Sequence, residues 1–204
     1  MNTQAKLIFF SLVQKLSFSR IFWNQKKNIY LTFDDGPDAK GTPMLLDILR
    51  KYQVRATFFV VGEHAQKHTE LLKKIVEEGH TVANHSYSHI RYANNMADFL
   101  ADVRQCEEVL KKANIPTKKL FRVPYGTVDL KLFAALLRKG YRIAFWNKDT
   151  KDYKLKSASD VNGYMDINGL QDGDVVLLHD YPKVTPEILE KILSTHSDKK
   201  FVAL

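Results

Sequence analysis

Two adjacent carboxylates, Asp34 and Asp35, follow an apolar, strand-like stretch at residues 29–31. Neighbouring carboxylates at the end of a strand repel each other unless a cation or a bound proton compensates their charge. Strand ends are also where α/β proteins place catalytic groups. The pair therefore predicts chemistry that uses a cation. The alternative is an ordinary Asp-Asp-Gly-Pro turn whose carboxylates accept backbone N–H bonds.

Two histidines, His85 and His89, are the candidate partners of this pair. Imidazoles at positions i and i+4 can converge on one face of a helical turn, and two histidines with one carboxylate form a catalytic zinc or iron site with open positions. Taken alone, the histidines could equally lie on an exposed loop, but their occurrence together with the carboxylates favours a metal. Because Cys106 is the single cysteine, the ligands must be nitrogen and oxygen atoms.

Arg122 and His179 follow two further apolar runs. A fixed guanidinium can hold an aspartate ionised as a base, and the Pro124–Gly126 turn can expose backbone N–H groups to an oxyanion. His179 can act as a general acid if a carboxylate, for which Asp152 is the candidate, raises its pKa. The alternatives are a loop arginine paired with any acid and a histidine at the edge of the core. The remaining histidines are expected to be surface or capping residues: His64, His68, His80 and His196.

The elements that position these groups alternate between strand and helix patterns. The predicted helices cover residues 43–52, 69–78, 96–113, 130–139 and 186–196. The predicted strands cover residues 28–33, 56–61, 81–85, 120–124, 141–146, 174–179 and 200–204. The segment 148–173 is predicted to be a loop with a short helix.

Most of the candidate polar residues fall at the carboxyl ends of the predicted strands, as do Asp149 and Asp152. An α/β barrel brings such ends to one face, whereas an open sheet would scatter them. The pattern therefore favours a single-domain α/β barrel of about seven strands.

The composition of the 204 residues, 45% hydrophobic and 26% charged, is typical of one globular domain. The net charge of +8 can attract an anionic polymer or surface, or simply maintain solubility. Nucleic acid is not expected as a partner, because no compact binding motif is present. Residues 1–27 lack a clear cleavage site and an apolar run long enough to span a bilayer. We expect them to form an amphipathic helix on the domain, or a leader that contacts a membrane surface, which leaves a cell-envelope or a cytoplasmic location open.

Five motifs, in order, resemble those of the NodB-like polysaccharide deacetylases, also called carbohydrate esterase family four. The first, Thr-Phe-Asp-Asp-Gly at 32–36, the second, His-Ser/Thr-x-x-His at 85–89, and the fifth, Leu-x-His at 177–179, are matched in full. The third has Val123 in place of a proline, and the fourth has Tyr153 in place of a tryptophan. The resemblance covers residues 28–204.

This resemblance implies a distorted (β/α)7 barrel and a role for each motif residue. Asp35, His85 and His89 would bind a divalent metal, most often zinc, with cobalt, nickel, iron or manganese as options. Asp34 would be the general base, oriented by Arg122, and His179 the general acid, tuned by Asp152. The backbone N–H of Tyr125 would bind the oxyanion. Tyr153 and Leu177 would line the substrate groove.

The implied reaction is the hydrolysis of N-acetyl groups on the amino sugars of a polysaccharide or cell-wall glycan, by attack of an activated water on the amide carbonyl. A monomer is expected. Because Tyr153 departs from the family pattern, a related hydrolase of another amide remains an alternative, such as a deformylase of a lipid-linked sugar or a ureide amidohydrolase. A non-catalytic glycan-binding protein is the alternative from another class.

Overall fold

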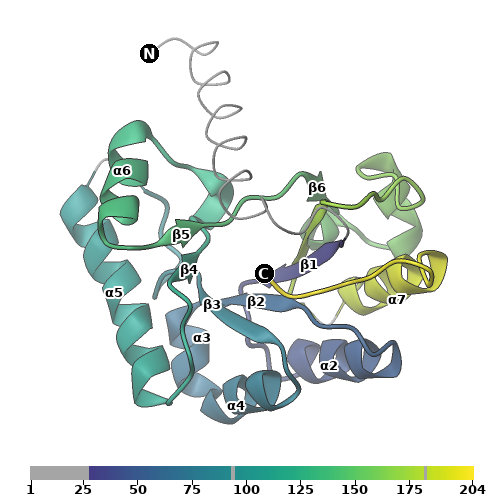
Figure 1. The fold of residues 1–204 in the computed structure, drawn as a ribbon, viewed down its shortest axis with the longest axis horizontal. Helices are drawn as coiled ribbons and strands as arrows, with labels where there is room; N and C mark the ends of the chain where they lie inside the picture. The colour runs from purple at the N-terminus through teal and green to yellow at the C-terminus, as the bar shows by residue number, and fades with distance from the viewer. Residues whose placement is uncertain (1–27, 93–94, 182) are drawn as a thin grey trace.

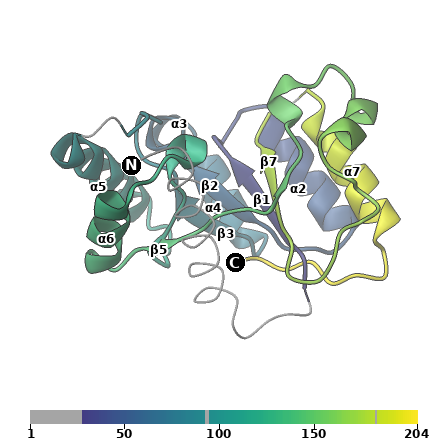
Figure 2. The same cartoon turned by 90° about the horizontal axis from the view of Figure 1, so that it is seen from above.

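One curved sheet of seven parallel strands organises the chain in a computed structural model, which describes residues 28–92, 95–181 and 183–204. The strand order is β5-β4-β3-β2-β1-β7-β6, and helices surround the outside of the curl (Figures 1 and 2). The strands are β1 Tyr30–Asp34, β2 Thr57–Val60, β3 Thr81–Asn84, β4 Leu120–Phe121, β5 Arg142–Ile143, β6 Lys148–Asp149 and β7 Val175–His179. The predicted α/β barrel is confirmed, as a distorted half-barrel.

The register of the central strands brings the polar strand ends to one level. Strand β1 pairs with β7 so that Asp34 lies opposite His179, and β2 pairs with β3 so that Val60 lies opposite Asn84. Asn84 in turn lies opposite Phe121 of β4. The residues that follow these positions, among them His85 and Arg122, therefore emerge at the same end of the sheet.

Residues 142–149 form the closing segment of the barrel. At its start Ala144 N donates to Phe121 O of β4 over 2.8 Å, and further along Asn147 N donates to Val175 O of β7 over 3.2 Å. The segment thus joins both edges of the sheet. The predicted strand 141–146 was too long, and the predicted loop was wrong at its start, because Lys148–Asp149 pairs with β7 as β6.

The predicted last strand, 200–204, was also wrong. Only Phe201 forms an isolated bridge, to Ile29, while the backbone N–H of Leu204 donates to the Thr57 hydroxyl over 2.9 Å. Thr57 begins β2, so this tail lies at the amino ends of the strands. Its apolar character reflects packing of Leu204 against a core cluster that includes Phe59 and Ala144.

The helices agree with the predicted ranges to within about two residues, as boundary fraying allows. They are α2 Gly41–Lys51, α4 Thr69–Glu77, α5 Met96–Lys112, α6 Leu130–Arg138 and α7 Thr185–Thr195. Gly79 and Gly140 follow two of them with positive φ angles of 83° and 82°, the left-handed backbone that glycine favours after a helix. The six-residue helix α3, Gly62–Lys67, was not predicted, because it is too short to show an apolar period.

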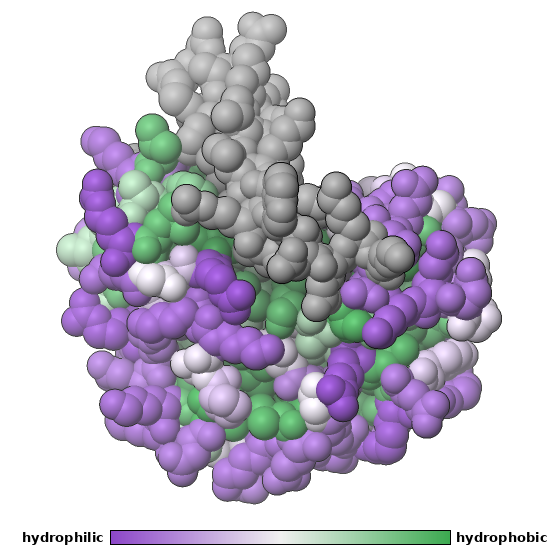
Figure 3. All heavy atoms as spheres, in the orientation of Figure 1, coloured by the Kyte–Doolittle hydropathy of each residue, from purple (hydrophilic) through white to green (hydrophobic). Residues whose placement is uncertain are grey.

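The irregular segment contains two short 3₁₀ helices, η2 Asp152–Lys154 and η3 Ala158–Gly163, and a third, η1 Pro124–Gly126, follows β4. Figure 3 shows hydrophilic side chains over most of the visible face, with hydrophobic groups near its centre. None of the described helices is long and apolar enough to cross a membrane. The predictions for residues 1–27 lie outside the described residues.

Candidate metal and catalytic site

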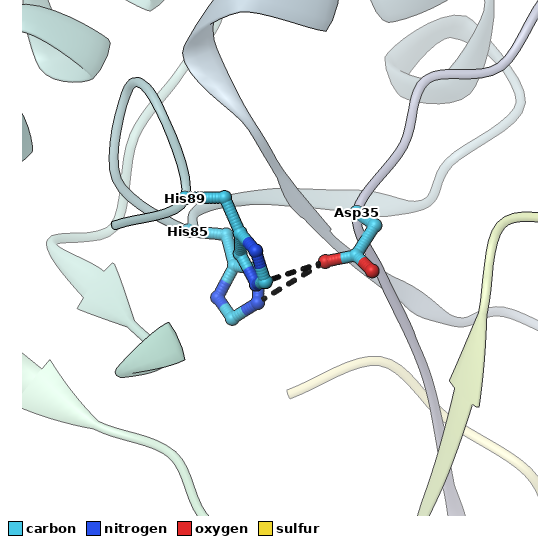
Figure 4. Close-up of side chains that lie close together, drawn as sticks. All are labelled: Asp35, His85 and His89. Atoms are coloured by element: carbon cyan, nitrogen blue, oxygen red, sulfur yellow. Dashed lines mark ion pairs between the residues drawn. The ribbon is translucent and has the colours of Figure 1, made fainter. Parts of the chain in front are cut away.

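Asp35, His85 and His89 converge at the carboxyl end of the sheet, and their ligand atoms lie within 4.8 Å of one another. Asp35 Oδ1 is 3.5 Å from His85 Nε2 and 3.2 Å from His89 Nε2. Figure 4 shows the carboxylate and both imidazoles pointing toward one another. The structure therefore brings the three predicted metal ligands together.

Two ligand atoms of this cluster, Asp35 Oδ1 and His85 Nε2, can accept a cation. Asp35 Oδ1 is buried and has no hydrogen-bond partner among the described residues. His85 Nδ1–H donates to Arg122 O over 2.8 Å, which leaves the Nε2 lone pair facing Asp35. An orphaned carboxylate oxygen beside two imidazoles fits a divalent ion such as zinc, with positions left for water and substrate.

Electrostatics keep these ligands in the forms that bind a metal. Burial alone would raise the pKa of Asp35, but the charges of His85 and His89 and a hydrogen bond from Tyr181 outweigh it and lower the pKa. Burial, together with the neighbouring His85, lowers the pKa of His89. An ionised carboxylate and a neutral imidazole follow, both of which are metal-binding forms.

The loop 85–89 is not the helical turn that the i, i+4 spacing predicted. Ser86 and His89 have positive φ angles of 67° and 53°, a left-handed backbone that a right-handed helix does not allow. Asp102 on α5 holds the loop by accepting hydrogen bonds from Tyr87 N over 2.9 Å and from the Ser88 hydroxyl over 2.5 Å. The histidines thus converge through loop geometry, and the role of Asp102 was missed because an isolated aspartate on a helix carries no sequence signal.

Asp34 lies beside this cluster and is paired with Arg122, as predicted. Arg122 Nη1 donates to Asp34 Oδ1 over 2.7 Å and to Thr32 Oγ1 over 2.8 Å. The guanidinium is completely buried, with its carbon 4.1 Å from the centre of the Phe59 ring. Because the guanidinium is buried against Phe59 and bonded through Nη1, Arg122 orients the Asp34 carboxylate.

His179 faces the cluster from β7 and is paired with Asp152, also as predicted. His179 Nδ1–H donates to Asp152 Oδ1 over 2.7 Å, while Asp152 Oδ2 accepts from His179 N and from the Thr185 hydroxyl, each over 2.7 Å. Burial would lower the pKa of His179, but the hydrogen bond and charge of Asp152 outweigh it and raise the pKa. The imidazole therefore stays protonated to higher pH than an ordinary histidine.

The three candidate ligands, Asp34 and His179 line one pocket of about 460 Å³, whereas Arg122 and Asp152 lie behind them. The predicted groove residues Tyr153 and Leu177 line it, and so does Tyr125, whose backbone is in the left-handed region with φ 59°. Four of the lining residues were not predicted: Arg91, Trp146, Lys151 and Tyr181. Of these, Tyr181 donates its hydroxyl to Asp35 Oδ2 over 2.6 Å and stacks its ring on His179.

The expectation that the remaining histidines are surface or capping residues was wrong for His80, whereas His196 is the C-cap residue of α7. His80 and His196 are buried. His80 Nδ1 accepts the N–H of Ala56 over 3.2 Å, and His196 Nε2–H donates to Ile167 O over 2.6 Å. Both satisfy backbone groups inside the fold, a role that polarity alone does not predict.

Comparisons with known proteins agree with this geometry. The model of the family described as polysaccharide deacetylase matches residues 24–144. A peptidoglycan-N-acetylglucosamine deacetylase of Bacillus cereus is 34% identical, over 96% of this chain and 73% of the relative. The peptidoglycan-N-acetylmuramic acid deacetylase PdaA of Bacillus subtilis is 30% identical, over 90% of this chain and 72% of the relative.

Among solved structures, a family 4 carbohydrate esterase from Streptomyces lividans in complex with acetate superposes with a TM-score of 0.77. It is 30% identical, and the match covers 88% of this chain and 93% of that one. Sequence, fold and motif geometry thus agree. The chain belongs to the NodB-like polysaccharide deacetylases of carbohydrate esterase family four.

Proposed function

We propose that this protein is a metal-dependent deacetylase that hydrolyses the N-acetyl group of an amino sugar in a cell-wall glycan. The observation that carries the proposal is the orphaned Asp35 Oδ1 between two imidazoles, with Asp34 and His179 in the same pocket. The names of the relatives, which specify N-acetylglucosamine and N-acetylmuramic acid, support the substrate class.

A divalent ion held by Asp35, His85 and His89, which we take to be zinc, would supply Lewis-acid polarisation of the acyl oxygen and acidify a water. Asp34 would accept the proton that this water loses as its oxygen bonds to the carbonyl carbon. Arg122 keeps the Asp34 carboxylate aimed into the pocket, because their 2.7 Å pair is buried from competing solvent.

The second half of the reaction would use Tyr125, which lies beside His89, and His179 from β7. The backbone N–H of Tyr125 would donate to the tetrahedral oxyanion, a contact whose loss typically costs about 3 kcal/mol in the barrier. His179 would give its Nε2 proton to the amide nitrogen as the C–N bond breaks. Acetate and a free amino sugar leave, and the proton taken up by Asp34 balances the one given by His179.

Elemental analysis coupled to acetate release from chitooligosaccharides and peptidoglycan tests the proposal. We expect one divalent ion per chain and acetate release that a chelator abolishes. The variants His85→Ala and His89→Ala should lose both metal and turnover, whereas His68→Ala, which changes a histidine outside the pocket, should lose neither. Acetate release at an unchanged rate from metal-free protein would refute the proposal.

A second candidate is hydrolysis of another linear amide, which Tyr153 favours because it departs from the tryptophan of the family motif. Acetate, formate and ammonia release measured over one substrate panel separates the two. If formate or ammonia is the main product of the metal-loaded protein, the proposed N-acetyl substrate is wrong. The proposed catalytic groups would stay the same.

A further inference from the structure

Arg91 is a pocket residue that the proposed mechanism does not use. It lies two positions after the ligand His89 and lines the same pocket. Its guanidinium carbon is 4.2 Å from the centre of the Tyr125 ring, and that ring is 4.7 Å from the His89 ring. The Arg91 guanidinium therefore packs on the Tyr125 ring, which in turn contacts the candidate ligand His89.

The guanidinium of Arg91 is oriented, and among the described residues it donates to one side chain. Nη1 donates to the Thr127 hydroxyl over 3.2 Å. Because a guanidinium carries five N–H groups in a planar fork, most of its donors remain available at the pocket. The contacts with the Tyr125 ring and the Thr127 hydroxyl limit the motion of the Arg91 side chain, which is otherwise exposed.

The charges around the pocket distinguish Arg91 from the other cations. Lys151 is paired with Asp149 over 2.5 Å, and Arg122 is paired with Asp34 over 2.7 Å. Among the ion pairs of residues 28–92, 95–181 and 183–204, none includes Arg91. Arg91 is thus a pocket cation without a carboxylate partner within the described part of the protein.

We propose that Arg91 binds a carboxylate of the glycan, so that the preferred substrate is an acidic amino-sugar polymer. The inference rests on the proposed deacetylase function and adds a substrate class to it. A planar guanidinium matches a carboxylate with two parallel N–H···O bonds, a geometry that lysine cannot reproduce. An N-acetylmuramic acid residue, whose lactyl ether ends in a carboxylate, has the required chemistry. The carboxylate can belong to the sugar that is deacetylated or to its neighbour.

The test compares matched glycans that differ only in this group. Peptidoglycan oligosaccharides with the lactyl carboxylate intact, and the same oligosaccharides with it reduced to an alcohol, are assayed with the zinc-loaded full chain. We expect the kcat/KM ratio, intact over reduced, to be about 10 for the natural protein and near 1 for Arg91→Gln, as for the loss of one partly exposed charged hydrogen bond. Arg91→Lys should keep only part of the ratio. Arg104→Gln, which removes the same charge from α5 outside the pocket, should keep all of it.

The ratio separates this inference from the proposed function. Equal kcat/KM on both glycans by the natural protein, or an unchanged ratio in Arg91→Gln, overturns the role of Arg91 while deacetylation stands. If neither glycan is hydrolysed, calorimetry measures the affinity of the natural protein for each glycan. The same affinity for both overturns the inference. A higher affinity for the intact glycan, which Arg91→Gln abolishes, supports it. Mass spectrometry of the product shows which sugar has lost its acetyl group, and so whether the carboxylate is on that sugar or its neighbour.

Discussion

The two sides of the pocket satisfy their polar atoms in opposite ways. On the metal side, Asp35 and His89 themselves have positive φ angles of 72° and 53°, and the buried Asp35 Oδ1 has no hydrogen-bond partner in the part of the chain that the structure describes. On the acid side, His179 ends a regular strand, and Asp152 accepts from the His179 ring, the His179 backbone and Thr185. The carboxylate of Asp35 thus has an oxygen without a hydrogen bond among the described residues, whereas both oxygens of Asp152 accept hydrogen bonds.

This difference indicates what each side is built to hold. A buried oxygen without a hydrogen-bond partner is costly unless a ligand supplies the missing interaction, which the proposed cation would do on the metal side. The acid side is complete as it stands, and its hydrogen bonds stabilise a proton on His179. We therefore expect changes on the metal side to alter metal content or turnover outright, and changes on the acid side to alter its pH dependence.

The substitution Asp34→Asn should have the largest effect on turnover. It removes the proposed base, so turnover should fall by about 10³-fold, within the usual range for acid–base catalysis. The metal should remain, because Asp35, His85 and His89 are unchanged. Removing the buried partner of Arg122 also lowers the free energy of unfolding, by about 3 kcal/mol or more, so rates are measured below the unfolding temperature that circular dichroism gives. Turnover equal to that of the natural protein, with metal bound, would exclude Asp34 as the base.

The substitution Asp152→Asn should move the pH profile of kcat/KM. Asp152 raises the pKa of His179, and a general acid loses activity as the pH rises through its pKa. Without the carboxylate charge that pKa falls, so the alkaline limb shifts to lower pH, with a loss of about 10²-fold at neutral pH.

Thr185→Val provides the matched control on the acid side. It removes one hydrogen bond to Asp152 Oδ2 but leaves the negative charge, so the alkaline limb should move much less than in Asp152→Asn. An identical profile in the natural protein and Asp152→Asn would show that His179 does not supply the proton. The same result would contradict the expectation that changes on the acid side alter the pH dependence.

The substitution Gly36→Ala tests where the two sides touch. A Cβ at Gly36 would lie 2.1 Å from the carboxylate of the buried Asp180, whose backbone N–H donates to Asp34 O over 2.8 Å. Something must shift, so we expect unfolding to become easier by about 2 kcal/mol, as for other overpacked sites. Chemical denaturation measures the change, and Asp180→Ala in the same chain should recover part of it. Additive effects of the two substitutions would contradict the predicted clash.

The sequence predicted which side chains come together better than it predicted the backbone that carries them. Strand ends in parallel sheets share one edge, so residues as distant as Asp35 and His85 could be expected to meet. The i, i+4 spacing of His85 and His89 could not distinguish a helical turn from a loop, because the loop depends on hydrogen bonds to Asp102, which comes later in the chain. Local pattern carries no information on such a long-range contact.

The irregular half of the barrel was harder to predict for a related reason. Strands β4, β5 and β6 have two residues each, which is too short for alternation to be seen. Closure through residues 142–149 depends on pairing with both β4 and β7. The sequence of residues 200–204 resembles a strand because packing at the amino ends of the strands and pairing within a sheet both favour apolar residues. Pocket residues such as Arg91 and Tyr181 likewise belong to no motif.

The substitution Tyr153→Trp should have the smallest effect and probes only the groove. Tyr153 lies beside the pocket with 47% of its surface exposed, and its ring contacts that of His179 at 4.9 Å. A larger aromatic surface at this place should improve stacking on a sugar by about 0.5–1 kcal/mol, so KM for long chitooligosaccharides should fall about threefold while kcat and the pH profile stay unchanged. Michaelis kinetics on oligomers of increasing length measure this effect, which should vanish for the shortest substrate if stacking occurs outside the site of cleavage. A changed kcat instead would mean that residue 153 acts through its contact with His179, and that the groove and the acid side are a single functional unit.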